Sequence, residues 1–165
     1  MNPNPHILEI DNRQEDRPVD LRKLRAWTLA ALESMGCTAE LGIHLVGAQE
    51  MAQVNWDYLR HQGSTDVITF EGDAAAGLAG EICVSADTAA RYVGADLASA
   101  RGRAPGAPLQ KKFSAELTLY LVHGWLHLVG YDDLQPAKKR RMRAAEARAM
   151  KLLRTAESVP EFKLL

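Results

Sequence analysis

Two histidines, a glycine and an acid share the short segment "LVHGWLHLVGYDD", residues 121–133. His123 and His127 are four residues apart, so on a helix both imidazoles lie on one face. Gly130 predicts the end of that helix, because glycine tolerates the positive φ that lets the chain turn back. The returning chain carries Asp133. Two imidazoles and a carboxylate leave one position open on a tetrahedral Zn²⁺, which is typical of catalytic sites.

The spacing favours Asp133 as the third ligand, but its neighbour Asp132 is an alternative. Asp132 is also suited to orienting one of the imidazoles instead of binding the ion. A simpler interpretation is that both histidines are packed core residues, and it predicts no bound metal. If a metal is present, its bound water ionises at about pH 7, so the segment indicates metal-assisted hydrolysis.

The same spacing of two histidines, a glycine and a third ligand occurs in metzincin peptidases. Those enzymes place a glutamate directly after the first histidine, where it acts as the general base. This chain has Gly124 at that position. The peptidase interpretation is therefore disfavoured.

Charge is distributed unevenly along the chain. Residues 136–154 hold eight basic residues and one acid, a net charge of +7, whereas the remaining chain has twelve basic and twenty acidic residues, a net −8. A solvated helix face explains such a segment, and so does a surface that contacts the phosphates of a nucleic acid.

The composition is that of an ordinary globular protein of one domain, with 165 residues and 47% hydrophobic residues. No apolar run is long enough for a membrane span, and the N-terminus does not resemble a signal peptide. Cys37 and Cys83 lie in predicted apolar segments. We therefore expect reduced, buried thiols and a cytoplasmic protein.

Hydrophobic periodicity predicts an α+β fold, with a small mixed sheet of about four strands and about five helices. The metal site is then at the end of the central helix. Residues 65–70 and 81–86 are expected to pair as an antiparallel hairpin. The expected strands are 6–10, 40–47, 65–70 and 81–86, and the expected helices are 19–36, 48–60, 85–101, 109–130 and 136–157.

Four segments together resemble a known family. "HGWLHLVGYDD" is similar to the H-G-x-L-H-L-x-G-Y-D-H signature of the YbeY-type endoribonucleases. "VNWDYLRHQGSTDVITF" (54–70), "AGEICVS" (79–85) and "MRAAE" (142–146) resemble three further blocks of that family. Their order and spacing agree over roughly residues 40–150, most of the chain.

This resemblance implies a single metal-dependent endoribonuclease-like domain over residues 1–165, with one Zn²⁺ held by His123, His127 and Asp133. It implies a hydrolase that prefers single-stranded RNA and acts in ribosomal RNA maturation, near the 3′ end of the small-subunit RNA, and in ribosome quality control. The implied partners are ribosomal RNA, the ribosomal small subunit and a ribosome-associated GTPase.

The chain departs from the family pattern at two positions. Asp133 replaces the usual third histidine, and Leu59 occupies the place of an arginine thought to serve catalysis. Arg60 follows directly and is the candidate for the arginine's role, unless that role is vacant. His61 is a second catalytic candidate, for a proton or phosphate contact, or else a surface histidine. Two other functions stay open: a non-catalytic, metal-containing ribosome-assembly factor, and a metal-dependent hydrolase of another substrate.

Overall fold

Four strands form one mixed sheet in the computed structural model, which describes residues 7–14, 21–34, 39–72, 78–94 and 107–155. The sheet order is β1-β2-β4-β3. Strands β1, β2 and β4 are parallel, whereas β3 is antiparallel to β4, so the predicted hairpin is confirmed. The strands are β1 (Ile7–Asn12), β2 (Ala39–Val46), β3 (Val67–Glu71) and β4 (Leu78–Ser85).

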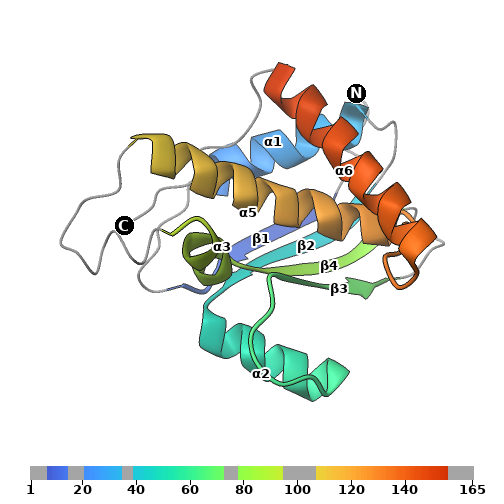
Figure 1. The fold of residues 1–165 in the computed structure, drawn as a ribbon. Coiled ribbons are helices and arrows are strands. Elements are labelled where there is room, and N and C mark those ends of the chain that lie inside the picture. Colours follow the sequence, from blue (N-terminus) through green and yellow to red (C-terminus); the bar gives the residue numbers. More distant parts are fainter. Residues whose placement is uncertain (1–6, 15–20, 35–38, 73–77, 95–106, 156–165) are drawn as a thin grey trace.

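Helices cover both faces of the sheet, which confirms the predicted α+β class (Figure 1). On one face lie α1 (Leu21–Ser34) and the long α5 (Ala107–Leu128), with α6 (Pro136–Thr155) packed against α5. The opposite face carries α2 (Ala48–Leu59), and α3 (Ala86–Tyr92) follows β4 at one end of the sheet. No helix within the described ranges is long and apolar enough to cross a membrane.

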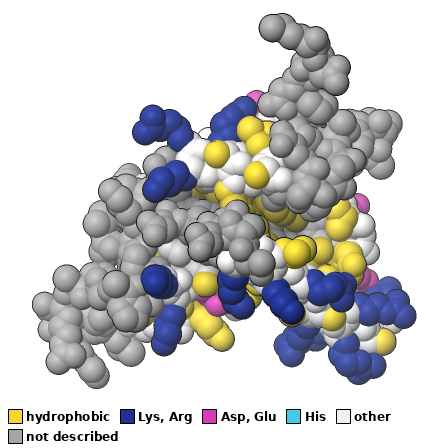
Figure 2. All heavy atoms as spheres, turned by 90° about the horizontal axis from the view of Figure 1, so that it is seen from above, with side chains coloured by type: hydrophobic (Ala, Val, Ile, Leu, Met, Phe, Trp, Pro, Cys, Tyr) yellow, Lys and Arg dark blue, Asp and Glu magenta, His cyan; other side chains and the backbone are white. Residues whose placement is uncertain are grey.

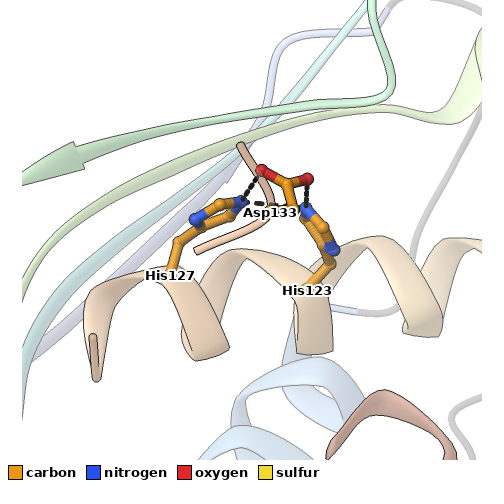
Figure 3. Close-up of side chains that lie close together, drawn as sticks. All are labelled: His123, His127 and Asp133. Atoms are coloured by element: carbon orange, nitrogen blue, oxygen red, sulfur yellow. Dashed lines mark hydrogen bonds and ion pairs between the residues drawn. The ribbon is translucent and has the colours of Figure 1, made fainter. Parts of the chain in front are cut away.

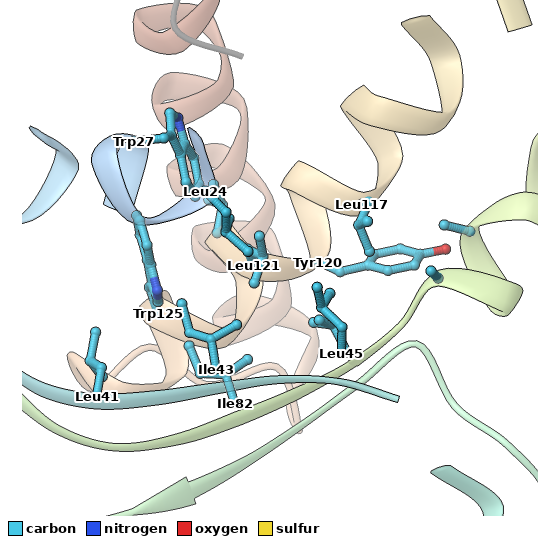
Figure 4. Packing of buried hydrophobic residues seen from close by; sticks show 14 of the residues in the cluster. Leu24, Trp27, Leu41, Ile43, Leu45, Ile82, Leu117, Tyr120, Leu121 and Trp125 are labelled. Carbon is cyan, nitrogen blue, oxygen red and sulfur yellow. The ribbon is translucent and has the colours of Figure 1, made fainter. Parts of the chain in front are cut away.

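The main core lies between the sheet and α5 (Figure 4). Strand β2 directs Leu41, Ile43 and Leu45 into it, because alternate residues of a strand share one face. Helix α5 contributes Trp125, whose ring stacks on Trp27 of α1 at a centroid distance of 4.9 Å. The central helix is thus buried against both the sheet and a neighbouring helix.

Helix α5 approaches the sheet closely at Gly124. A Cβ atom at this position would lie 2.8 Å from Cγ2 of Ile82 and 3.2 Å from Cγ2 of Thr69. The absence of a side chain therefore lets the helix axis come down onto β3 and β4. Close packing against the sheet thus explains the glycine at position 124. The comparison with metzincin peptidases showed only that the general base is missing there.

The prediction of one continuous helix over 85–101 is wrong. Helix α3 ends at Tyr92, because Gly94 takes a φ of 81° that a right-handed helix does not contain. Residues 95–101 lie outside the described part of the chain. Cys83 is buried as expected, whereas Cys37 falls outside the described residues.

Candidate metal centre

Three side chains meet at the end of α5, and they are the three that the sequence predicted to be ligands (Figure 3). The Nε2 atoms of His123 and His127 are 2.9 Å apart. Oδ2 of Asp133 lies 3.6 Å from Nε2 of His123, and Oδ1 of the same carboxylate lies 3.8 Å from Nε2 of His127. One ligand atom from each residue thus lies within 4.8 Å of the others.

These separations fit a zinc-sized ion. Ligand atoms bound at about 2.0–2.1 Å and at tetrahedral angles lie about 3.3–3.4 Å from one another. The distance between the two nitrogens, 2.9 Å, is shorter than that value, and the distances from the nitrogens to the two Asp133 oxygens, 3.6 and 3.8 Å, are slightly longer. Two imidazole nitrogens and an acidic oxygen that converge in this way form a donor set for a borderline cation such as Zn²⁺.

The turn after α5 brings Asp133 back to the histidines. Gly130 has a φ of 106°, and no atom lies near the position of its missing Cβ, so the backbone conformation alone requires glycine. Its N–H donates to the carbonyl of His127 at 3.1 Å, and the N–H of Tyr131 donates to that of Leu126 at 2.9 Å. This pair of bonds is a Schellman motif. The predicted glycine turn is confirmed.

Asp132 is directed elsewhere. Its Oδ1 accepts a hydrogen bond of 2.7 Å from the N–H of Leu134, and its Oδ2 lies 3.3 Å from Nζ of Lys138. The bond from the Leu134 N–H, followed by the contact with Lys138, lowers the pKa of this carboxyl below its ordinary value. Asp132 therefore fastens the loop to the start of α6, and Asp133 is left to face the imidazoles.

A fourth residue, Glu146 of α6, contacts the centre from the far side of His123. Its Oε1 is hydrogen-bonded to Nδ1 of His123, the nitrogen that does not face the other two ligands. The sequence segment "MRAAE" contains this residue but gave it no role. A signal was nevertheless present, because Glu146 is the sole acidic residue of the strongly basic α6.

The centre is accessible to solvent, since the side chains of His123, His127 and Asp133 are 22%, 27% and 35% exposed. A pocket of about 350 Å³ lies at the turn between His127 and Asp133, lined by residues 129–132 with Lys138 and Arg141. Two cationic side chains therefore lie beside the turn that carries Asp133.

The structure does not bring Arg60 and His61 to this group. Arg60 follows the last residue of α2, on the opposite face of the sheet from α5, with a φ of 56° (Figure 1). Its guanidinium lies 5.8 Å from the ring centre of Trp56. Among the described residues, no hydrogen bond, ion pair or ring contact joins Arg60 or His61 to His123, His127 or Asp133. Their catalytic roles stay predictions.

A mixed α+β sheet with two histidines and an aspartate at the end of its central helix defines a candidate metal-binding protein. The family model described as Endoribonuclease YbeY matches residues 9–154 of this chain. The chain belongs to the Endoribonuclease YbeY family.

Relatives with the same family name are similar over most of the chain. The Endoribonuclease YbeY of Syntrophotalea carbinolica is 35% identical over 150 residues, covering 86% of this chain and 91% of the relative. That of Geobacter sulfurreducens is 35% identical over 155 residues, covering 88% and 95%. A solution structure from Thermotoga maritima has a TM-score of 0.49 and 19% identity, over 92% of this chain and 95% of that one.

Proposed function

We propose that this chain is a metal-dependent endoribonuclease that cleaves single-stranded ribosomal RNA, as one domain over residues 1–165. Its work is the maturation of the small-subunit RNA near the 3′ end and the quality control of ribosomes. The observation that carries the proposal is the convergence of His123, His127 and Asp133 in a chain of the Endoribonuclease YbeY family. The ribosomal small subunit and a ribosome-associated GTPase are the proposed partners.

The ion that these residues would hold is Zn²⁺, one per chain. Zinc supplies a Lewis acid and a bound water that ionises at about pH 7. His123, His127 and Asp133 would hold the ion, and three protein ligands are the number that catalytic zinc sites use. The ligand residues fix the position at which a phosphodiester is attacked, and their partial exposure admits the RNA.

The basic face of α6 is proposed to hold the RNA backbone. All eight basic residues of this helix are exposed, and Figure 2 shows Lys and Arg side chains at several places on the face seen from above, with the largest group at its lower right. Lys138 and Arg141 line the pocket at the turn between His127 and Asp133. A strand that follows these cations is thereby led to the ligands, since phosphate contacts position a nucleic acid without reading its sequence.

Arg60 and His61 are the proposed catalytic residues outside the ligand set. The guanidinium of Arg60 would stabilise the charge that develops on the phosphate oxygens, and the imidazole of His61 would contact a phosphate or move a proton. Both residues are exposed at the end of α2 and thus free to contact a bound RNA.

The test is cleavage of single-stranded RNA by the purified chain, with and without a chelator. We expect cleavage that chelation abolishes and added Zn²⁺ restores, together with little cleavage of double-stranded RNA. Casein, assayed beside RNA, tests the peptidase alternative. RNA binding without cleavage in the zinc-loaded protein would instead favour the non-catalytic assembly factor.

The variant His127→Ala tests the ligand assignment within the same experiment. The imidazole of His127 makes polar contacts with His123 and Asp133. Removal of this imidazole should therefore abolish tight zinc binding and leave the circular dichroism spectrum intact. His44→Ala is the matched control, because His44 also lies between two carboxylates, those of Asp11 and Glu81. Full zinc stoichiometry in His127→Ala, measured by elemental analysis, would contradict the assignment.

A further inference from the structure

We infer that Glu146 is a positioning residue for the metal centre, acting through His123; the inference rests on the proposed function. Its carboxylate accepts the proton of His123 Nδ1. The proton is thereby held on Nδ1, and the lone pair of the ring is held on Nε2, toward His127 and Asp133. Metal-binding histidines are commonly oriented in this way by a carboxylate on their second nitrogen.

Glu146 itself is not placed to bind the ion. The three ligand atoms that converge belong to His123, His127 and Asp133, and Glu146 contacts the opposite edge of the His123 ring. An ion between the two Nε2 atoms is therefore separated from this carboxylate by the imidazole. The residue influences the metal by fixing the tautomer and the orientation of one ligand.

The position of Glu146 on α6 supports a specific role. The buried and half-buried residues of this helix form one stripe that packs toward α5, and Glu146 is its sole charged member, with a side chain only 17% exposed. A carboxylate on an apolar packing face is costly unless it is hydrogen-bonded. The stripe consists of Met142, Ala145, Glu146, Ala149, Met150 and Leu153.

The charged residues of α6 are divided by sign between its outer and inner faces. Its eight cationic side chains are exposed, whereas its one carboxylate lies on the inner face. A residue selected for solubility or for general charge balance would lie on the outer face. The inner location, together with the bond to His123, identifies the histidine as the group that Glu146 serves.

The experiment compares Zn²⁺ affinity between the wild-type chain and Glu146→Leu, by competition with a chromophoric chelator. Leucine suits the apolar stripe but accepts no hydrogen bond. We expect zinc affinity to fall by about 10- to 100-fold while the urea midpoint stays unchanged or rises. Glu146→Gln retains an acceptor oxygen and should give an intermediate loss, and it replaces the leucine variant if that variant fails to fold.

Met142→Leu is the matched control, since it changes a buried residue of the same packing stripe and leaves the carboxylate of Glu146 in place. Its zinc affinity should equal that of the wild type. A slowly exchanging Nδ1–H signal of His123 in the zinc-loaded wild type, absent from Glu146→Leu, would support the fixed tautomer. Equal zinc affinity in wild type and Glu146→Leu would overturn this inference alone. Absence of zinc uptake by the wild type would overturn it together with the proposed function.

Discussion

Arg60 holds an unusual backbone conformation for a residue with a side chain, with a φ of 56° at the end of α2. Glycine adopts this region without the steric cost that a Cβ brings. The guanidinium also lies over the ring of Trp56, an exposed contact worth about 0.5–1 kcal/mol. The backbone conformation of Arg60 therefore lowers the free energy of unfolding slightly, and the contact of its side chain with Trp56 raises it slightly.

The variant Arg60→Gly should consequently change the free energy of unfolding by less than about 1 kcal/mol, because the two effects oppose each other. RNA cleavage should nevertheless fall by about 100-fold if the guanidinium stabilises the transition state. Urea unfolding and a single-turnover cleavage assay measure the two quantities. Undiminished cleavage would show that the arginine role is vacant in this chain.

The convergence of the candidate metal ligands was predictable because their geometry is local. His123 and His127 are one helical turn apart, and the glycine turn needs only the residues that follow them. Glu146 was not assigned, because its contact depends on how α6 packs against α5. The sequence shows the spacing within an element, but the contacts between elements are set by tertiary packing.

At the scale of the elements, the contact between α5 and the sheet depends on Gly124. We expect Gly124→Ala to lower the free energy of unfolding by about 1–3 kcal/mol, because the new Cβ overlaps Cγ2 of Ile82. This loss should exceed the gain in helix propensity from alanine, which is at most about 1 kcal/mol. Urea denaturation of the variant measures the difference.

A double-mutant cycle with Ile82→Ala isolates the cause. Removal of the isoleucine branch should relieve the overlap, so the double variant should be more stable than the sum of the two single changes predicts. Simple additivity of the two changes would mean that Gly124 is required for another reason. The cycle therefore separates a steric contact from a general loss of helix packing.

Helix α6 is expected to determine the salt dependence of RNA binding. Replacement of Arg140 and Arg143 by alanine should reduce the slope of log affinity against log salt by about 0.7 for each phosphate that is no longer neutralised. Arg91→Ala on α3 is the control, since this exposed arginine lies on a different helix. Fluorescence anisotropy with single-stranded RNA over a salt series gives the slopes. Equal slopes in all variants would remove α6 from the RNA-binding surface.

Hydrophobic periodicity predicted the order and type of the helices and strands, but it did not always predict the residues at which they end. The hairpin of β3 and β4 was predicted because its strands are adjacent in sequence. The parallel pairing of β1 with β2 and of β2 with β4 joins distant segments, and periodicity contains no information on such partners. The helix predicted over 85–101 is too long because its periodicity continues past Gly94, whose positive φ is incompatible with a right-handed helix.

At the scale of the whole molecule, stability should decline at alkaline pH. Burial raises the pKa of the Cys83 thiol from its ordinary value of 9.0 to about 11. Burial, and next the nearby Glu116, also raise the pKa of Tyr120 above its ordinary value of 10.0. The unfolded chain ionises first in both cases, so the stabilisation is complete below pH 9.0 for the thiol and is lost as pH rises through about 11.

Urea midpoints measured from neutral pH to about pH 11 should therefore fall on the alkaline side. The variant Cys83→Ala should show a shallower decline over the range from 9.0 to about 11, whatever its stability at neutral pH. An identical alkaline decline in wild type and variant would exclude the thiol as a cause. Tyr120 would then account for the remaining dependence.

Supply of the proposed metal should also influence how long the chain survives among proteases. His123 on α5 is hydrogen-bonded to Glu146 on α6, and Asp133 lies in the turn between these helices, so an ion held there would tie the turn and, through His123, α6 to α5. Ligands that bind only the native state raise the cost of local opening. If the group holds a metal, a metal-starved cell would thus clear the protein by nicking at this turn, and the abundance of the protein would follow the abundance of the metal.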